Sequence, residues 1–338
     1  MNKQIKYGRL FRIAFISLLL FIRFIYFEVN QKTNKKKIKY DLIIPINPLD
    51  VQKFMKHKIF YEKFLNFTNI ILITSLDAKK FIENDSSIIF INEDIIIQKE
   101  KINEFLNKTR FIMINRVGWY EQQFIKMAYA RICKNEYYLV WDADTIPIKF
   151  IEMFKNEQPF FDMKMEHHFP YFNTMERIIP KLNYVNKSFI SEHMIIKTDF
   201  MKSLLDNIEM NHKLTGKLFW EKILFAIDIN DINGSGFSEY ETYGTYVNTR
   251  YPNAYIQRNW HSLRDAERYF GEPENLNLND INWLSQDYHA LSFEYWTPFN
   301  IQNLPVVKNY SLQKMYKPEN FFNDYDKIFL NHTKIENM

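Results

Sequence analysis

Residues 137–147 read YYLVWDADTIP, an apolar run that leads into two aspartates one residue apart. Aromatic and branched residues in a short run are typical of a buried strand. A buried strand that ends in Asp142 and Asp144 carries two carboxylates whose charge needs compensation. Such a pair suits Mn²⁺ or Mg²⁺, with substrate phosphates completing the coordination. Taken alone, the motif leaves a solvated turn as the alternative.

Strand-like and helix-like segments alternate before this stretch. Strands are predicted at residues 40–46, 69–75 and 87–91, and helices at 51–67, 77–83, 102–108 and from Gly118 to about Cys133. This alternation favours an α/β fold of the Rossmann type, with a mostly parallel sheet flanked by helices. Ligands bind beyond the carboxyl ends of such strands, and we expect the aspartate pair there.

Further elements are expected after the aspartates. The pattern predicts helices at residues 150–155, 175–182, 200–210 and 218–227, and a strand at 189–196. A strand at 189–196 would place Glu192 and His193 on opposite faces.

Length and charge exclude several classes of protein. The 338 residues are 46% hydrophobic, enough for one large or two small domains. The net charge of +4 comes from interspersed charges, so no nucleic-acid partner is expected. Cys133 is the single cysteine of the sequence, which excludes an intramolecular disulfide and a cysteine zinc site.

The N-terminal region predicts a membrane anchor. Residues 1–9 form a short basic tail, residues 10–27 an apolar signal anchor, and residues 28–39 a basic linker. We therefore expect a single-pass membrane protein that contacts the membrane through this helix, with an interfacial amphipathic helix as the alternative. Residues 40–304 would form the main domain, and residues 305–338 a tail packed on it.

Residues 234–244, GSGFSEYETYG, form the second informative stretch. Ser238 is expected to cap a helix, with Glu241 completing a capping box, which is a structural alternative to a catalytic role for Glu241. Glu239 falls in the first helical turn, where the helix dipole would keep it ionised. An ionised carboxylate near a metal could accept a proton from an attacking hydroxyl.

Three further residues are candidates for ligand binding. Lys126 and Arg116 could meet a diphosphate or a sugar, and each could instead be a solvated charge. His261 is a candidate third metal ligand, although a single histidine is more often structural.

Four motifs together resemble a known family. They are Gly118-Trp119-Tyr120 with Gln122-Gln123, residues 138–144, His193-Met194, and residues 237–244. Over about residues 40–300 the chain resembles the DUF6492 family, which we group with the GT-A nucleotide-sugar transferases. The resemblance implies a GT-A-like, Rossmann-type nucleotide-binding half, a metal on Asp142 and Asp144, and catalytic Glu239 and Glu241.

The expected function is that of a metal-dependent glycosyltransferase. It would move a sugar from a nucleoside-diphosphate donor to a glycan, lipid or protein acceptor, using Mn²⁺ or Mg²⁺. One alternative is a phosphatase or phosphotransferase with an aspartate nucleophile. Its Asp-x-Asp-x-Thr motif would need a threonine at the position of Ile146, and Thr145 falls one residue too early. The other is a membrane-anchored, non-catalytic binding protein.

Overall fold

The computed structural model describes residues 38–110, 112–295 and 299–336. Residues Lys39–Met338 form one compact unit. The predicted anchor, residues 10–27, lies outside the described residues. The prediction of a single-pass membrane protein is corrected here, because no helix within the described ranges has both the length and the apolar character to cross a membrane.

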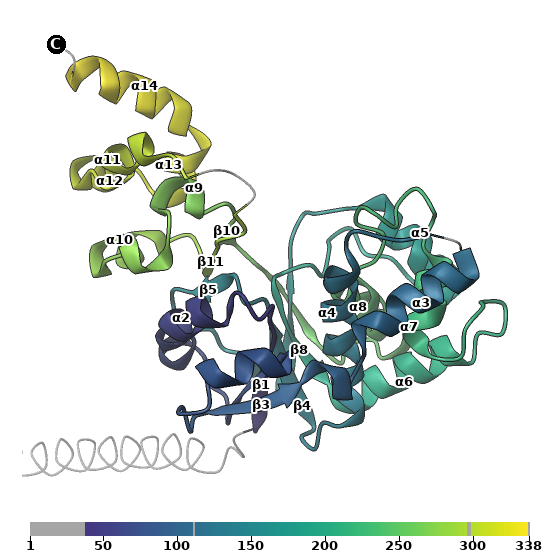
Figure 1. The fold of residues 1–338 in the computed structure, drawn as a ribbon. Coiled ribbons are helices and arrows are strands. Elements are labelled where there is room, and N and C mark those ends of the chain that lie inside the picture. Colours follow the sequence, from purple (N-terminus) through teal and green to yellow (C-terminus); the bar gives the residue numbers. More distant parts are fainter. Residues whose placement is uncertain (1–37, 111, 296–298, 337–338) are drawn as a thin grey trace, which may run out of the picture. The chain divides into compact units, whose positions relative to one another are not determined.

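A five-stranded sheet forms the centre of the unit (Figure 1). Its strand order is β3-β2-β1-β4-β8. The first four strands run parallel, and β8 pairs with β4 in the antiparallel direction. The strand bounds are β1 Tyr40–Pro45, β2 Ile70–Thr74, β3 Ile88–Asn92, β4 Tyr137–Trp141 and β8 His193–Lys197.

Apolar runs explain why these segments are strands. Every residue of β1, β2 and β4 is buried, as expected for parallel strands covered on both faces. Trp141 and Tyr138 of β4 are among the largest fully buried side chains. The predicted mixed α/β class with a parallel sheet and flanking helices is confirmed.

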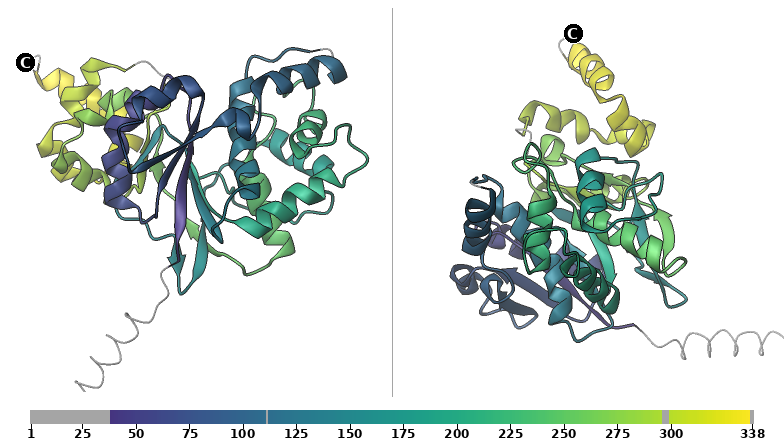
Figure 2. Two further views of the ribbon diagram at one scale, coloured as in Figure 1. Left: turned by 60° about the horizontal axis from the view of Figure 1, so that its bottom comes forward. Right: turned by 90° about the vertical axis from the view of Figure 1, so that its right-hand side faces the viewer.

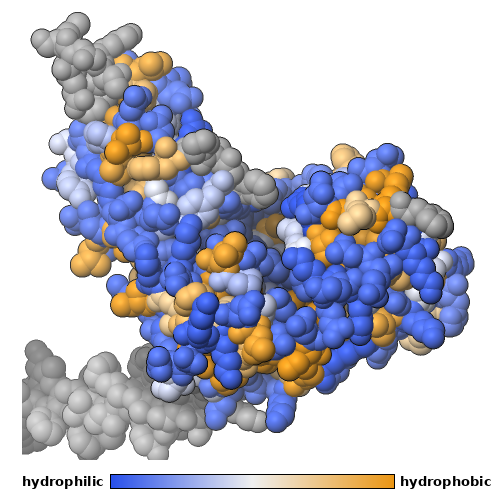
Figure 3. Space-filling model, in the orientation of Figure 1, coloured by the Kyte–Doolittle hydropathy of each residue, from blue (hydrophilic) through white to orange (hydrophobic). Residues whose placement is uncertain are grey.

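Helices cover both faces of this sheet (Figure 2). Helix α4 contacts β1, and helix α6 contacts β8. Helix α2 contacts β5 (Thr145–Pro147), a strand that follows β4 and belongs to a smaller sheet. The helices up to residue 250 are α2 Val51–Phe64, α3 Lys99–Arg110, α4 Val117–Ala128, α5 Phe169–Ile178, α6 Thr198–Glu209, α7 Phe219–Ala226 and α8 Glu239–Arg250. The space-filling view shows a mainly hydrophilic surface over them, with separate apolar patches (Figure 3).

Two smaller sheets adjoin the central one. One has the order β10-β11-β5 and the other the order β6-β7-β9. Their bounds are β5 Thr145–Pro147, β6 Phe154–Lys155, β7 Gln158–Met163, β9 Ile256–Asn259, β10 Ser262–Leu263 and β11 Ala290–Ser292. The chain thus leaves the central sheet at Trp141, turns through Asp142–Asp144, and enters another sheet at Thr145.

The C-terminal part is helical. The bounds are α9 Glu267–Phe270, α10 Leu278–Leu284, α11 Leu304–Val307, α12 Tyr310–Met315, α13 Pro318–Asn323 and α14 Tyr325–Glu336. Aromatic contacts join these helices: the rings of Trp283 and Phe321 lie 5.3 Å apart, and those of Tyr269 and Phe322 lie 4.7 Å apart.

Several predicted elements differ from the structure. The helix predicted at residues 175–182 is α5, which spans Phe169–Ile178, and the helix predicted at residues 77–83 is a 3₁₀ helix at Leu76–Phe81. Residues 150–155 are not a helix, because Phe154 and Lys155 form β6 and pair with β7. The strand predicted at residues 189–196 begins only at His193, after irregular backbone in which Glu192 has a left-handed φ of 58°.

Candidate active site

The backbone of the aspartate turn is held from two sides. The N–H of Asp142 donates to the carbonyl of Glu192 (2.9 Å), and the N–H of Phe293 donates to the carbonyl of Asp144 (2.8 Å). Left-handed backbone at a residue other than glycine costs about 1–3 kcal/mol, and Glu192 is one of seven such residues in the described part of the chain. The strained conformation of Glu192 therefore lies next to the turn that it supports.

Thr145, the first residue of β5, also holds the turn in place. The carbonyl of Thr145 accepts hydrogen bonds from the Tyr61 hydroxyl (2.9 Å) and the Trp141 indole N–H (2.6 Å). The Thr145 hydroxyl contacts Ser292 (2.7 Å) and donates to Asp144 Oδ1 (3.2 Å). Burial is the main cause that keeps the pKa of Tyr61 well above its usual value, so its hydroxyl remains a donor. Hydrogen bonds from β5, β11 and α2 thus hold the turn in place.

A cavity of about 600 Å³ opens above this turn. Pro45, the last residue of β1, and Asn47 line it at one strand end, and Asp142 and Asp144 line it beyond the end of β4. The cavity therefore lies at the carboxyl edge of the parallel strands, where the sequence predicted a ligand site.

Acidic side chains dominate the lining of the cavity. Seven carboxylates face three lysine or arginine side chains. The carboxylates are Asp50, Asp142, Asp144, Glu166, Glu192, Glu239 and Glu294, and the cations are Lys53, Lys126 and Arg264. Without an added cation, an anionic ligand would meet net repulsion.

Lys126 joins the aspartate turn to the start of α8. Its Nζ donates to Asp142 Oδ1 (2.5 Å) and to Glu239 Oε1 (2.7 Å) and lies 4.5 Å from the centre of the Tyr240 ring. Burial alone would lower the pKa of Lys126, but Asp142 and Glu239 raise it well above its usual value. Lys126 therefore compensates two carboxylates. The sequence predicted that Lys126 could bind a diphosphate, but its ammonium group is already paired with Asp142 and Glu239.

Within the described ranges, no lysine or arginine pairs with Asp144. Desolvation by the cavity wall, followed by the carboxylates of Asp142 and Glu294, raises the pKa of Asp144. Because the residue is exposed to the cavity, the neighbouring carboxylates are the cause that we stress. Among the described residues, none donates a hydrogen bond to Oδ2 of Asp142 or to Oδ2 of Asp144. Two crowded carboxylates with free oxygens suit a divalent cation that keeps the rest of its shell for water and phosphate.

Glu239 and Glu241 have different surroundings. Burial raises the pKa of Glu239, and Lys126 acts in the opposite direction, so the helix dipole is not the main influence expected from the sequence. Glu239 lines the cavity, whereas Glu241 does not. The Glu241 carboxylate accepts from the Ser188 hydroxyl (2.5 Å) and the Phe189 N–H (3.1 Å). Glu241 thus holds the segment before β8, and a catalytic role for it is withdrawn.

The capping box expected at α8 forms only in part. Ser238 caps the helix by accepting from the Glu241 N–H (3.3 Å), but the Glu241 side chain bonds elsewhere.

Arg116 acts beside the cavity and does not line it. Its guanidinium donates to the Gly234 carbonyl (2.7 Å) and to the Ser235 hydroxyl (3.1 Å), and it lies 4.2 Å from the centre of the Trp119 ring. It therefore supports two lining residues, Trp119 and Ser235, and is not placed to bind a diphosphate directly.

His261 is exposed and does not line the cavity. Its N–H contacts His289 (3.4 Å), while the neighbouring Trp260 turns inward and donates to Glu192 (2.9 Å). The prediction of His261 as a metal ligand is therefore corrected. The reason is that neighbouring residues point in opposite directions at this turn.

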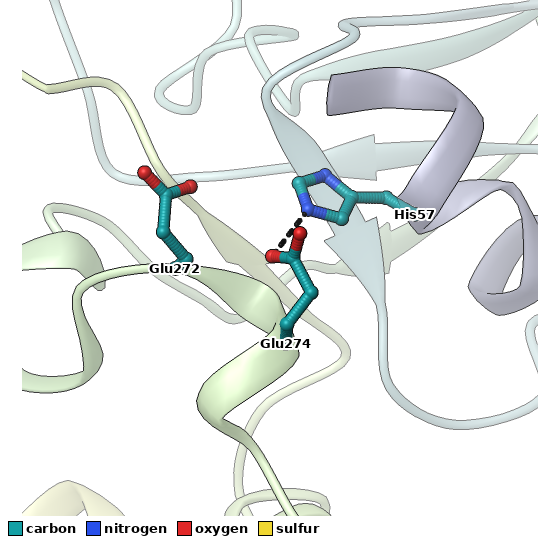
Figure 4. A group of neighbouring side chains, drawn as sticks. All are labelled: His57, Glu272 and Glu274. Atoms are coloured by element: carbon teal, nitrogen blue, oxygen red, sulfur yellow. Dashed lines mark hydrogen bonds and ion pairs between the residues drawn. The ribbon is translucent and has the colours of Figure 1, made fainter. Parts of the chain in front are cut away.

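The described residues contain one group of three potential metal ligands, His57, Glu272 and Glu274 (Figure 4). His57 Nε2 lies 2.9 Å from Glu274, and Lys53 and Lys56 lie 3.8 and 3.5 Å from Glu272 and Glu274. Because these cations already compensate both glutamates, the group joins α2 to the turn at 272–274 and is not proposed as a metal site.

Sequence reasoning missed several lining residues. Tyr240 donates to Asp142 Oδ1 (2.8 Å), and Arg264 connects Glu166 and Glu294 (2.9 and 2.7 Å). No local pattern marks these contacts, because each joins segments far apart in the sequence. Helical periodicity could have grouped Gln123 with Lys126 on one face of α4.

Comparison with protein families matched one family model to residues 41–298. The chain belongs to DUF6492, a family of unknown function. The predicted membership of this family is thus confirmed. The family description names no activity, so it assigns none to this chain. A comparison with curated proteins gave no match.

The DUF6492 chain also has similarity to solved structures. Mouse xyloside xylosyltransferase 1 is 11% identical with a TM-score of 0.42, covering 78% of this chain and 100% of that one. Galactosyltransferase LgtC, in complex with donor and acceptor sugar analogs, is 8% identical with a TM-score of 0.41, covering 84% and 99%. The mannosyltransferase Ktr4p from S. cerevisiae is 11% identical with a TM-score of 0.38, covering 65% and 68%. These TM-scores are low, so the function proposed below rests on the site itself.

Proposed function

We propose that the DUF6492 chain is a metal-dependent glycosyltransferase that moves a sugar from a nucleoside diphosphate to a glycan, lipid or protein acceptor. The observation that carries this proposal is the rigid Asp142–Asp144 turn at the carboxyl edge of the sheet, with both carboxylates facing an acidic cavity. A diphosphate can enter such a cavity when a divalent cation offsets the charge.

Asp142 and Asp144 would hold Mn²⁺ or Mg²⁺. A bound cation supplies charge stabilisation to the departing nucleoside diphosphate. Lys126 keeps Asp142 in place and also holds Glu239 at the cavity wall. In an inverting reaction, the acceptor oxygen bonds to the anomeric carbon as the bond to the diphosphate breaks, and Glu239 takes the acceptor's proton.

The phosphatase alternative is less consistent with the site. An aspartate that attacks phosphorus needs a free oxygen and polar groups that face the phosphoryl group. The Thr145 hydroxyl is fully buried and engaged with Asp144 and Ser292, so it cannot meet a phosphate. The non-catalytic alternative predicts that Asp142 and Asp144 can be lost without consequence for ligand binding, which the variants described below test.

Thermal unfolding of the full chain tests the proposal. We expect one member of a panel of nucleoside diphosphates to stabilise the protein only with Mn²⁺, by about 2.7 kcal/mol at a hundredfold excess over Kd. Asp142→Asn and Asp144→Asn should abolish the shift, while the exposed Asp199→Asn outside the cavity should keep it. Absence of a Mn²⁺-dependent shift with every nucleotide would refute the proposal.

A further inference from the structure

Glu192 contacts the aspartate turn through its backbone. Its carbonyl accepts the N–H of Asp142, one step beyond the register pair of Trp141 and His193 at the end of the β4–β8 ladder. Because Glu192 has a left-handed φ of 58°, β8 begins only at His193, and the ladder ends where Asp142 begins its turn. A contact that holds the backbone of Glu192 in place therefore also holds Asp142.

The two neighbours of Glu192 in the sequence stabilise its conformation. The Ser191 hydroxyl donates to the His193 carbonyl (2.7 Å), and His193 Nδ1 lies 2.7 Å from the Ser191 carbonyl. The other ring nitrogen of His193 lies 2.9 Å from Asp162, and the ring stacks on Trp141 with 4.5 Å between the centroids. Strained backbone persists only where the surrounding structure over-determines it, and these contacts enclose Glu192 on both sides.

The carboxylate of Glu192 is buried and paired at both oxygens. Of the seven described residues other than glycine with a left-handed φ, Glu192 alone is buried, with 5% of its surface exposed. Its Oε1 accepts from the Lys164 ammonium group. Its Oε2 accepts from the Trp260 indole N–H (2.9 Å) and the Ser262 hydroxyl (3.2 Å). All three partners donate, so a carboxylate fits here, whereas an amide would set its own NH₂ group against a donor.

We propose that Glu192 is a positioning residue for metal binding at the aspartate turn, an inference that rests on the proposed function. The three donors hold its carboxylate, and the carbonyl of the same residue holds the N–H of Asp142. Glu192 does not bind the cation itself, because both of its side-chain oxygens are already paired. It keeps Asp142 in place beside Asp144 for a cation that both would bind.

Direct Mn²⁺ binding to the full chain tests this assignment, measured by electron paramagnetic resonance of the free ion with and without UDP, GDP or ADP. Glu192→Gln keeps the shape of the side chain but mispairs its NH₂ group. Lys164→Met combined with Glu192→Gln removes the donor that this group would meet and leaves the amide oxygen for Trp260 and Ser262. The matched control is Glu157→Gln, because Glu157 also has a left-handed φ (67°) but is exposed outside the cavity. Thermal melts establish that each variant folds.

Hydrogen exchange of the Asp142 amide is the second measurement, because this N–H is the group that Glu192 holds. We expect Glu192→Gln to weaken Mn²⁺ binding about tenfold, as is typical for partners that orient a metal ligand. Exchange of the Asp142 amide should become at least about tenfold faster, because the local contact that protects it is weakened. The double variant should return to within about threefold of the wild type in both measurements, and Glu157→Gln should change neither by more than about twofold.

The outcomes separate this inference from the proposed function. A folded Glu192→Gln variant with wild-type Mn²⁺ affinity would overturn the inference alone, even if its stability were lower, because the role of Glu192 would then be only structural. A loss of affinity that Lys164→Met does not reverse would overturn it as well. If Glu192→Gln does not fold, the double variant decides, since tenfold weaker Mn²⁺ binding by it would also exclude the assignment. If the wild type binds no Mn²⁺ with any of the nucleotides, the proposed function itself fails, and this inference with it.

Discussion

Replacing Lys126 with methionine should destabilise the protein more than any surface lysine change. Lys126→Met keeps the length of the side chain and removes its charge. The Lys126 side chain is 9% exposed and that of Glu239 is 4% exposed, so Glu239 would be left buried without compensation. Asp142, at 30% exposed, is partly solvated and would suffer less.

The size of the effect follows from this burial. Breaking a buried ion pair by removing one partner costs about 3–5 kcal/mol. The partial exposure of Asp142 favours the lower end, so we expect a loss of about 3 kcal/mol. For a unit of this size, the apparent Tm should fall by roughly 6 °C. Lys126→Met combined with Glu239→Gln replaces the pair with neutral groups and should recover about 2 kcal/mol.

A double-mutant cycle measured by chemical denaturation at a fixed pH is the assay. Lys202→Met, which removes an exposed pair with Asp199, is the matched control and should cost less than about 0.5 kcal/mol. If Lys126→Met costs no more than this control, or if Glu239→Gln does not rescue it, our account of Lys126 as the compensating charge is incorrect.

Three further predictions concern Glu121, Gly244 and Asp144. Burial, followed by the charge of Glu93, raises the pKa of Glu121 from 4.5 to about 8. The folded state therefore holds a proton that the unfolded state loses between these pH values, so the free energy of unfolding falls as pH rises from 4.5 to 8. Glu121→Gln should flatten this slope in denaturation series and add about 1–3 kcal/mol at pH 8, and an unchanged slope would exclude the explanation. Gly244→Ala would bring its Cβ to 2.1 Å from the fully buried Phe189 ring and should cost about 2–3 kcal/mol in denaturation, partly recovered by Phe189→Leu. Asp144→Asn removes one crowded carboxylate, so it should raise the metal-free Tm while abolishing the Mn²⁺-dependent nucleotide shift; a lower Tm would contradict the repulsion that we describe.

Local sequence patterns predicted the parallel half of the sheet. The apolar branched runs of β1, β2, β3 and β4 lie within about two residues of their observed positions. For β1, β2 and β4 the reason is that burial of both faces requires continuous apolar sequence. The start of α8 was predicted from Ser238, whose hydroxyl caps the helix. The direction of β8 was not, because periodicity does not distinguish a parallel from an antiparallel strand.

Candidate site residues were predicted with mixed success, because local sequence shows where a residue lies along its strand or helix but not what its side chain contacts. The aspartate pair follows an apolar strand directly, so adjacency in sequence placed it at the sheet edge. His261 and Glu241 were assigned from residue type and motif, yet His261 is exposed outside the cavity and the Glu241 carboxylate is bonded to Ser188 and Phe189. Residue type states what a group can do, but the packing around the group decides what it faces.

The sequence alone determined the α/β class, the parallel strands and the position of two carboxylates at the end of one of them, because apolar runs and a strand terminus are local features. Only the tertiary structure decided how those carboxylates are compensated. Asp142 and Glu239 lie 16 and 113 residues after Lys126 in the sequence. Only the packing of α4 and α8 on the sheet brings both carboxylates within hydrogen-bond distance of the Lys126 ammonium group. The same packing buries Gln123 against the start of α8, where its Oε1 accepts the N–H of Glu239, because burial of a residue depends on every element around it.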